Sequence, residues 1–375
     1  MFSYIKSTIH LKHVVIIAIN ALCLIAFIVS LALSASVKTP LRSQQAARAW
    51  AGQSGERFAQ LSFFFPESAG FNEDSIREVR TSLDNALLSV SLESDTGRIL
   101  YTDAWAANGE VSVLSERGST TAPVIGVGGD FFLFHPLYLR DGTYLSPNDI
   151  MKDRVVLDEE LAWRLFGSVR LAGFEILING RPFIIAGVVS RESDFASAKA
   201  YTGGAGMFMS FEALMDMTDD GAHITCYEIV MPDPITGFAL GAMTDIFTGR
   251  DVDIVENSAR FSLEKSFAVV GAFGERSMRK DTIMYPYWEN AARYAEDWLA
   301  LLLVMSLLFI ICPAVFAVIY LVKIIHYLVK HGKITLRGII KKHDDRKYEK
   351  YILEHYEEPQ IYDIEDIINE VHNRK

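Results

Sequence analysis

The sequence predicts an α+β domain that is carried on two transmembrane helices and followed by a helical tail. Residues 14–35 and 299–322 hold no charged side chain, and each segment has the roughly 20 residues needed to cross a hydrocarbon core of about 30 Å. The residues between them have ordinary globular composition, and within this region residues 155–189 show the successive patterns of a strand, a short helix and a hairpin. Mixed patterns without repeats are typical of an α+β domain.

Composition narrows the possible partners. The 375 residues are half hydrophobic and carry a formal net charge of −11, so nucleic acid is not an expected partner, because its binding requires a basic face. The three cysteines include Cys23 and Cys312 inside the apolar segments, which leaves Cys226 alone in the middle of the chain. No disulfide is therefore expected within the middle domain.

The first apolar segment follows a short amino terminus that contains Lys6 and Lys12. A cleaved signal peptide is the alternative interpretation, but 22 apolar residues exceed the usual length of a signal core. Residues 40–60 are rich in alanine after Pro40, so we expect the first span to continue outward as a helical stalk, although Gly52 and Gly55 weaken a helix.

The next elements are predicted from periodicity. Residues 61–65 form an apolar run that Pro66 ends, which indicates a buried strand. Residues 75–88 carry an apolar stripe at helical spacing, made by Ile76, Val79, Leu83 and Leu87. Strands are then expected at 99–104, 111–114 and 124–127, because Asn-Gly and Gly-Ser turn signals separate these runs.

Residues 155–189 give the most detailed local prediction. Asp158 stands at a helix N-cap position after an apolar strand, and Gly167 is placed to end the helix in a left-handed conformation. Apolar residues then alternate from Phe174 to Ile178, and Asn179-Gly180 supplies the two residues of a type I′ turn. The returning run 183–189 is apolar at almost every position, so we expect a central, buried hairpin.

The remainder of the middle region leads back to the membrane. Residues 190–206 are polar and contain glycine, and we expect them to form a solvated connection. A strand at 224–231, a helix at 235–247 and a strand at 252–256 follow. Residues 285–297 are compatible with a helix and run directly into the second span, so a second stalk is expected there.

The segment after the second span is basic. Positive charge within about 15–20 residues of a span favours the cytoplasmic side, so both termini are expected in the cytoplasm and the large domain outside it. The basic residues are candidate contacts either for a partner protein or for anionic lipid: Lys323, Lys330, Lys333, Arg337, Lys341 and Lys342. Residues 361–371 carry an apolar helical stripe, which could fold back on the tail or contact another protein.

The sequence offers no recognisable catalytic or cofactor site. It contains no GxxxxGK[ST] motif for ATP, no Gly-x-Ser-x-Gly nucleophile elbow and no Cys/His pair at a family spacing. His135 has no second metal ligand near it in the sequence, so a packed or surface histidine is the expected role. We therefore expect no enzyme activity, no metal and no cofactor in this chain.

Two motifs carry a family resemblance. Residues 158–167 read DEELAWRLFG, and residues 173–189 read GFEILINGRPFIIAGVV. Together with the upstream segment 126–146 and the two flanking spans, these motifs resemble the MacB-like periplasmic core domain of ABC transporter permeases. The resemblance implies an ectodomain of two α+β lobes, one discontinuous and porter-like and the other inserted into it.

The resemblance also implies partners. Such permeases form dimers and are driven by a cytoplasmic ATPase that binds ATP, whose movement passes through the stalks to the outer domain as mechanotransmission. Family members carry three spans after the ectodomain, whereas one span is predicted here. We therefore expect either half of a split or paired permease, with a second permease chain or a second copy as partner, or an accessory subunit.

These inferences give one domain plan for a multi-pass protein of the bacterial cell membrane. It assigns 1–13 to the cytoplasmic amino terminus, 14–35 to the first span, 36–297 to the extracytoplasmic core with its stalks, 298–322 to the second span and 323–375 to the cytoplasmic tail. The leading functional hypothesis is a non-catalytic subunit of an ABC-type complex. The alternatives are a receptor or scaffold that works without ATP coupling and a membrane-anchored enzyme.

Overall fold

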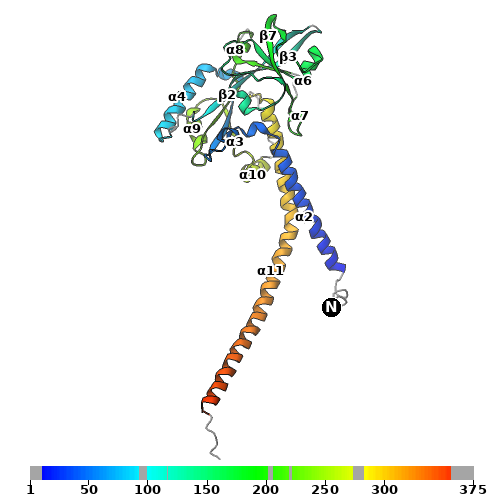
Figure 1. Ribbon diagram of the computed structural model, residues 1–375, viewed down its shortest axis with the longest axis vertical. Coiled ribbons are helices and arrows are strands. Elements are labelled where there is room, and N and C mark those ends of the chain that lie inside the picture. Colours follow the sequence, from blue (N-terminus) through cyan, green and yellow to red (C-terminus); the bar gives the residue numbers. More distant parts are fainter. Residues whose placement is uncertain are drawn as a thin grey trace, which may run out of the picture. The chain divides into compact units, whose positions relative to one another are not determined.

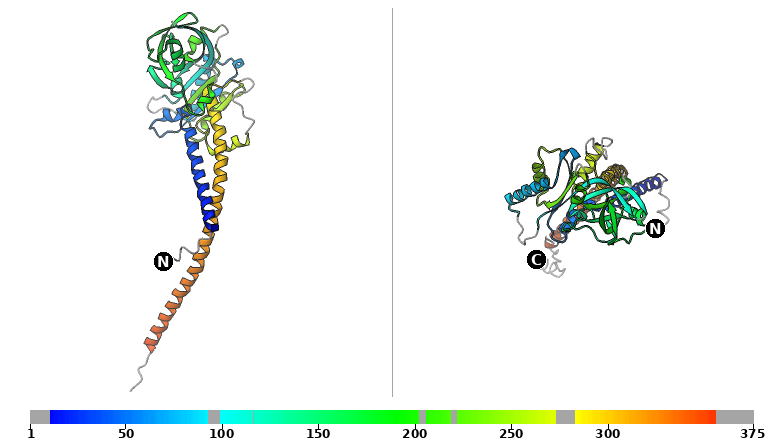
Figure 2. Two further views of the ribbon diagram at one scale, coloured as in Figure 1. Left: turned by 90° about the vertical axis from the view of Figure 1, so that its right-hand side faces the viewer. Right: turned by 90° about the horizontal axis from the view of Figure 1, so that it is seen from above.

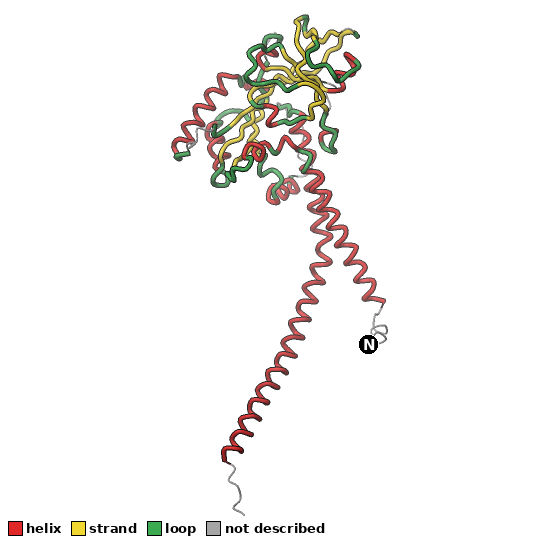
Figure 3. Tube along the Cα trace, viewed as in Figure 1, coloured by secondary structure: helices red, strands yellow, loops and turns green. Residues whose placement is uncertain are grey.

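The computed structural model describes residues 11–92, 99–115, 117–201, 206–218, 222–272 and 283–355. The chain divides into two compact units, one formed by residues 25–308 and the other by residues 1–24 together with 309–375. Every strand of the described chain lies in the unit 25–308, which Figure 1 shows in colours from blue to yellow and Figure 3 shows by secondary structure.

The strands form one ten-stranded sheet. Nine of them follow a single path of neighbours: β10 (Asp253–Glu256), β1 (Phe58–Phe64), β9 (Cys226–Pro232), β2 (Thr102–Ser115), β3 (Gly118–Gly129), β8 (Met207–Ser210), β5 (Arg154–Asp158), β7 (Arg181–Ser190) and β4 (Tyr138–Gly142). The tenth, β6 (Glu175–Ile178), pairs with both β2 and β7. The pairings β2–β3–β8–β5–β7–β6 therefore close into a ring, which is visible in the left view of Figure 2.

The long strand β2 belongs to both parts of this sheet. Its beginning, Thr102–Ala106, pairs with β9 in the open part of the sheet, while Val113 and Leu114 pair with β6 in the ring. Only the pairs β3–β8 and β5–β7 are parallel among the pairings that the structure describes. The ring is continuous in sequence, whereas the open part is assembled from strands before and after it.

Two apolar clusters cover opposite faces of the open part. Phe63 and Phe64 are adjacent on β1, and Phe63 belongs to one cluster while Phe64 belongs to the other. This follows from the alternation of side chains along a strand. The Phe63 face is covered by α4 (Glu73–Ser89) and α9 (Phe238–Ile246), and the Phe64 face by α3 (Ala46–Ala51), α5 (Phe131–Phe134) and the start of α11 (Tyr287–His355).

Several local predictions are confirmed. Helix α4 buries the predicted stripe and begins at Asn72, whose side chain accepts a hydrogen bond from the backbone of Ser75. Helix α6 (Glu159–Phe166) begins at Asp158, which accepts from the Leu161 N–H, and it ends at Gly167 with φ +70°. Asn179 and Gly180 have φ +49° and +78°, as the predicted type I′ turn requires.

The hairpin is central, but it is less buried than predicted. Strand β7 pairs with β4, β5 and β6, and Ile176, Ile178 and Ile185 are fully buried. Phe174 and Ile184 are instead 55% and 42% exposed. Ile184 alternates with the buried Phe183 and Ile185 along β7, so its side chain points away from the interior of the ring, and Phe174 precedes the first residue of β6.

Two predicted boundaries are wrong. Residues 102–104 of the first predicted run and the whole run 111–114 belong to the single strand β2, and Asn108-Gly109 is not a turn. A side chain on Gly109 would lie 2.9 Å from Leu214, so the glycine allows α8 (Phe211–Met215) to pack closely on the strand. The predicted first stalk is not continuous with the span. Helix α2 (Leu11–Lys38) ends before Pro40, because a proline disfavours the helical conformation of the residue that precedes it, and residues 40–60 then hold a short 3-10 helix and α3 before β1 begins at Phe58.

Two helices of the described chain are long and apolar enough to cross a membrane, judged by length and composition, at Val14–Lys38 and Tyr287–Lys330. The predicted spans 14–35 and 298–322 lie within these limits. Helix α11 passes Pro313 without ending and continues to His355. The apolar stripe predicted at 361–371 lies outside the described residues.

We predict that Leu83→Ala destabilises the protein by about 2–5 kcal/mol, because Leu83 is fully buried on the core face of α4. Leu88→Ala is the matched control, since Leu88 lies on the same helix and is 56% exposed, and its effect should stay within about 0.5 kcal/mol. Urea unfolding of both variants in detergent, followed by tryptophan fluorescence, measures the difference. Equal midpoints would contradict the described packing of α4.

Candidate functional site: the junction of helix α11 with the sheet

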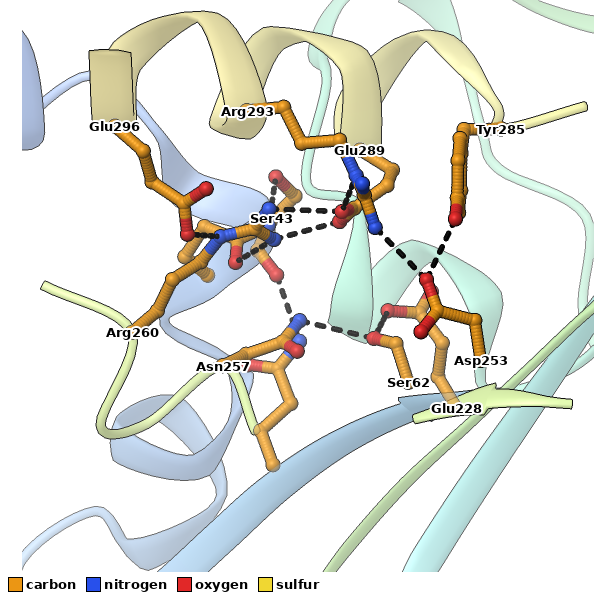
Figure 4. Close-up of polar contacts among 12 residues, drawn as sticks. Ser43, Ser62, Glu228, Asp253, Asn257, Arg260, Tyr285, Glu289, Arg293 and Glu296 are labelled. Atoms are coloured by element: carbon orange, nitrogen blue, oxygen red, sulfur yellow. Dashed lines mark hydrogen bonds and ion pairs between the residues drawn. The ribbon is translucent and has the colours of Figure 1, made fainter. Parts of the chain in front are cut away.

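A network of charged and polar side chains joins the first turns of α11 to the sheet, and Figure 4 shows it in detail. The participating residues come from α11, from β10 and the loop after it, from β1 and β9, and from η1 (Arg42–Gln44), the short helix after α2. We call this set the α11 junction: Ser43, Gln44, Gln60, Ser62, Glu228, Asp253, Asn257, Arg260, Tyr285, Glu289, Arg293 and Glu296.

Arg260 lies at the centre of the junction and is only 4% exposed. Its guanidinium donates two hydrogen bonds to the carboxylate of Glu289, at 2.6 and 2.8 Å, and a third to Glu296 at 2.6 Å. Two-point pairing of an arginine with a carboxylate fixes direction as well as distance. Burial acts to lower the pKa of Arg260, but the two carboxylates outweigh it and raise the pKa above its ordinary value, so the group stays charged.

Arg293 connects the same helix to β10. It donates to Glu289 at 2.6 Å, one turn away on α11, and to Asp253 at 3.0 Å. The Tyr285 hydroxyl donates to the same Asp253 oxygen at 2.6 Å, and the Arg293 guanidinium lies 3.8 Å from the centre of the Tyr285 ring. Burial and this hydrogen bond raise the pKa of Tyr285. Asp253 therefore receives two donors from the start of the stalk.

A second chain of hydrogen bonds carries the junction into the sheet. Asn257 donates to Ser62 at 2.9 Å, and Ser62 donates to Glu228 at 2.7 Å. The other carboxylate oxygen of Glu228 pairs with the buried ring of His135, which lies 4.2 Å from the ring of Trp288 on α11. His135 is thus a packed histidine, as expected from the sequence.

The segment after α2 joins the same network. Gln60 of β1 donates to the Ser43 carbonyl at 2.7 Å and accepts from the Ala46 N–H at 2.9 Å. Arg260 also donates to Gln44 at 3.3 Å. Both chain segments that lead to the apolar helices are therefore anchored to β1 and to each other through side chains that are buried or nearly so.

The loop 191–201 also packs on α11, which contradicts the predicted solvated connection. Tyr201 stacks on Tyr287 at 4.2 Å, and Phe195 contacts Tyr294 at 5.4 Å. The short helix α7 (Ser197–Ala200) is partly buried there. The aromatic and small side chains of the loop 191–201, rather than its overall polarity, determine that it packs on α11. Residues 202–205 lie outside the described chain.

A cavity of about 420 Å³ lies between strands of the ring and the first turn of α11. Its wall includes Tyr201, Met207, Phe208, Tyr287 and Asn290. The Asn290 side chain donates to the Tyr285 carbonyl, while its own oxygen is buried without a hydrogen-bond partner. The cavity wall thus combines aromatic and polar side chains.

The junction is a set of paired charges that holds separate parts of the chain together. Its carboxylates and guanidinium groups are paired with one another, and no cluster of three or more metal-binding side chains occurs in the described part of the chain. Removing one partner of a buried pair leaves an uncompensated charge, at a cost of about 3–5 kcal/mol. The arrangement therefore fixes the first turns of α11 to β10 and, through Asn257 and Ser62, to β1 and β9.

The basic residues proposed from the sequence lie elsewhere, on the continuation of α11. Lys323, Lys330 and Lys341 are exposed and share one face of the helix by their spacing, and Lys342 is exposed beside them. Lys323 also lies 5.6 Å from the Tyr320 ring. The side chains of Lys333 and Arg337 are outside the described part of the structure.

Sequence reasoning missed the α11 junction. The acidic residues Glu289 and Glu296 and the basic Arg293 fall on one face of α11, at spacings of four and three residues. This spacing was the one signal in the sequence that could have indicated a charged face on the helix. Nothing in the sequence connects them with Arg260 or Asp253, because the pairing depends on the fold.

Arg260→Met should destabilise the protein by about 3–5 kcal/mol, because it removes the two-point pairing with Glu289 and the bond to Glu296, and leaves Arg293 alone to balance the buried carboxylate of Glu289. Arg250→Met is the matched control, since Arg250 pairs at 3.3 Å with Glu78, which is 70% exposed, and such pairs contribute at most about 1 kcal/mol. Denaturant midpoints measure both. If the two variants lost the same stability, the junction would not be the structural anchor described.

The Glu192 carboxyl, in the loop that packs on α11, yields a pH prediction. Burial, helped by Asp194 and opposed by His135 and Arg42, raises its pKa to about 6. A raised acid pKa means that the folded state prefers the neutral form, so ionisation costs stability as the pH rises through the folded pKa. Glu192→Gln should therefore stabilise the protein above pH 7 by up to about 2 kcal/mol and have little effect below pH 4.5.

Thermal midpoints at the two pH values measure this effect. Glu175→Gln is the control, because Glu175 is exposed on β6, and its effect should stay within about 0.5 kcal/mol at either pH. A Glu192→Gln effect that did not depend on pH would refute the prediction.

Comparison with known proteins identifies the family. Residues 14–236, more than half of the chain, match the model of the MacB-like periplasmic core domain. A stretch of 82 residues is 32% identical to the macrolide export ATP-binding/permease protein MacB of Aggregatibacter actinomycetemcomitans, which covers 21% of this chain and 13% of that protein.

Three solved structures are similar at low identity. The periplasmic region of MacB from Actinobacillus actinomycetemcomitans is 18% identical, with a TM-score of 0.39, over 59% of this chain and 98% of that one. The extracellular domain of the transporter YknZ from Gram-positive bacteria is 15% identical, with a TM-score of 0.36, over 53% and 99%. A domain of a permease from Porphyromonas gingivalis is 13% identical, with a TM-score of 0.32, over 54% and 89%.

The family match agrees with the resemblance carried by the DEELAWRLFG and GFEILINGRPFIIAGVV motifs, and the two apolar helices fit a membrane protein. This chain belongs to the family of the MacB-like periplasmic core domain.

Proposed function

We propose that this chain is a non-catalytic membrane subunit of an ABC-type transporter or mechanotransmission complex, coupling a cytoplasmic ATPase to an extracytoplasmic domain. The observation that carries the proposal is the construction of α11. One helix runs from Tyr287 to His355, and its first turns are fixed to the sheet by the α11 junction. ATP is bound by the partner, and this chain contributes no cofactor site.

In this proposal both termini are cytoplasmic, α2 and α11 cross the bacterial cell membrane, and residues 36–297 lie outside the cytoplasm. The exposed lysines of α11 after residue 322 support this orientation, because positive charge close to a span favours the cytoplasmic side. The two parts of the sheet support a division into two lobes. The open part, assembled from strands on both sides of the ring in sequence, is the porter-like lobe, and the ring is the inserted lobe.

In this proposal, movement passes through the junction from α11 to the sheet. A shift of α11 moves Glu289, Arg293 and Glu296 together, since they share one rigid helix. Arg260 and Asp253 must follow or lose their buried pairs. Asp253 lies on β10, which pairs with β1, and β1 pairs in turn with β9, so the shift reaches the open part of the sheet. A second permease chain or a second copy of this one completes the assembly.

A receptor or scaffold that works without ATP is the second candidate, and the cavity beside Tyr201 and Tyr287 is the observation that favours it. A ligand there would contact the first turn of α11 directly. The two candidates differ in the partner of the basic segment after residue 322. The transporter subunit requires an ATPase there, whereas the receptor or scaffold does not.

The test is purification of the tagged full chain from its native membranes. We expect an ABC ATPase to co-purify in stoichiometric amount and to hydrolyse ATP. Replacing the exposed Lys323, Lys330, Lys341 and Lys342 by Gln should reduce its recovery at least tenfold if this segment is the docking site. The matched control replaces Arg346 and Lys347, which are exposed further along the same helix.

If no ATPase were recovered with the wild-type chain, the coupling proposal would be wrong and the receptor or scaffold candidate would take its place. If the lysine variant kept the ATPase but lost binding to vesicles that contain phosphatidylglycerol, the basic segment would be a lipid contact instead.

A further inference from the structure

The short helix α10 (Leu263–Gly271) has an apolar face that no part of the described chain covers. Leu263 and Phe267 are one turn apart and are 69% and 52% exposed. Val269, on the other side of the helix, is buried at 8% exposure. Ser262 caps the helix by accepting from the Lys265 N–H at 3.3 Å. The helix is thus well formed and attached by one face, while its second apolar face points away from the protein.

Helix α10 begins at the level where the apolar helix α2 ends. The Lys38 ammonium donates to the carbonyl of Phe261 at 3.4 Å, and Phe261 packs in a cluster with Val37, Ala291 and Ala295. Figure 1 shows α10 beside this end of α2. Because only Ser262 separates Phe261 from α10, the first turn of α10 lies next to the last turn of α2.

The pairing of α2 with α11 places Trp298 at the same height as the end of α2. The Ser30 and Ser306 hydroxyls are 2.8 Å apart. The two helices are antiparallel, because α2 leads toward the sheet and α11 leads away from it. Lys38 follows Ser30 by eight residues, and Trp298 precedes Ser306 by eight residues, which is about 12 Å along each helix. Trp298 and Lys38 therefore lie at similar heights.

Aromatic side chains gather around Trp298. Phe195, from the loop 191–201, contacts Trp298 at 5.3 Å and Tyr294 at 5.4 Å between ring centres, and it is 49% exposed. Tryptophan and tyrosine concentrate where a membrane meets water, and lysine extends its ammonium to the same zone. One level of the molecule thus combines the end of an apolar helix, a lysine, an aromatic group and the exposed apolar face of α10.

We propose that α10 lies in the interface of the outer leaflet, with Leu263 and Phe267 inserted at the boundary between headgroups and acyl chains. Helices of this kind lie in the membrane plane and bury their apolar face by about 5–10 Å. The inference rests on the proposed crossing of the membrane by α2 and α11.

A lipid surface fits this face better than a second protein. Two side chains on a nine-residue helix expose far less than the roughly 800 Å² per partner that stable protein interfaces bury. The face also adjoins the end of the apolar helix α2 through the Lys38–Phe261 contact, so lipid that surrounds α2 is already close to it. Insertion of α10 would hold the loop of Arg260 at a fixed height above the bilayer, since Arg260 and Ser262 belong to one short segment.

The experiment places an environment-sensitive NBD probe on single cysteines of the full chain in phosphatidylethanolamine/phosphatidylglycerol vesicles. Cys23, Cys226 and Cys312 are first replaced by Ala. The probe positions are Phe267→Cys, Lys265→Cys on another face of α10, Trp163→Cys on α6 and Ile25→Cys in α2; all four native side chains are exposed. Lipids with a spin label either high or low on the acyl chain act as quenchers.

We expect the shallow label to quench the Phe267 position at least twofold more than the Lys265 position and to leave the Trp163 position unquenched. The deep label should quench the Ile25 position. If the Ile25 position were quenched and the Phe267 position were not, the inference about α10 would be overturned while the span proposal stood. If neither were quenched, the span proposal itself would be wrong. An unquenched Phe267 position that cross-links to a second copy would instead assign α10 to a protein interface.

Discussion

The buried guanidinium of Arg260 holds three parts of the protein that are distant in sequence: the loop after β10, the segment after α2 and the start of α11. A charge that is buried to this extent is stable only when opposite charges surround it with good geometry. Glu289 and Glu296 meet this requirement from the same face of one helix, 29 and 36 residues away from Arg260 in the chain. The position of α11 relative to the sheet is therefore defined by charge pairing, and the apolar contacts beside it follow.

The sheet makes this arrangement possible because its open part is buried on both faces. Phe63 and Tyr227 fill one face, and Phe64 and Cys226 fill the other. Ser62 and Glu228 are paired with each other at the next position along β1 and β9 and are also buried, so they need polar partners inside the protein. Asn257 and His135 supply them. The polar chain from the junction thus enters a core that is otherwise apolar, and it connects α11 with strands that carry most of the packing.

The sequence predicts what depends on neighbours along the chain and fails where distant contacts decide. The Asp158 cap, the left-handed Gly167 and the Asn179-Gly180 turn need only local geometry, and all three are found. Asn108-Gly109 has the same turn signature, yet it continues β2, because β3 and β9 pair along the strand and Leu214 packs against the glycine. The loop 191–201 is polar overall, but Phe195 and Tyr201 fasten it to α11. The Arg260–Glu289 pair could not be predicted, because no local pattern relates the two residues.

The order of residues on α11 allows a single register against Arg260. The face of the helix opposite the junction carries Ala291 and Ala295, small residues on which a helix could slide with little steric resistance. The charges prevent this. A slip of four residues, about one turn, would in one direction bring Arg293, a like charge, to the place of Glu289, and in the other direction bring Ala292, whose side chain offers no hydrogen bond, to the place of Glu296. Because intermediate positions would take the buried Arg260 guanidinium away from both Glu289 and Glu296, the pairing resists sliding of α11 along its axis. The small side chains and the charged ones on this helix thus have complementary effects: the first permit close contact, and the second make the contact rigid along the helix axis.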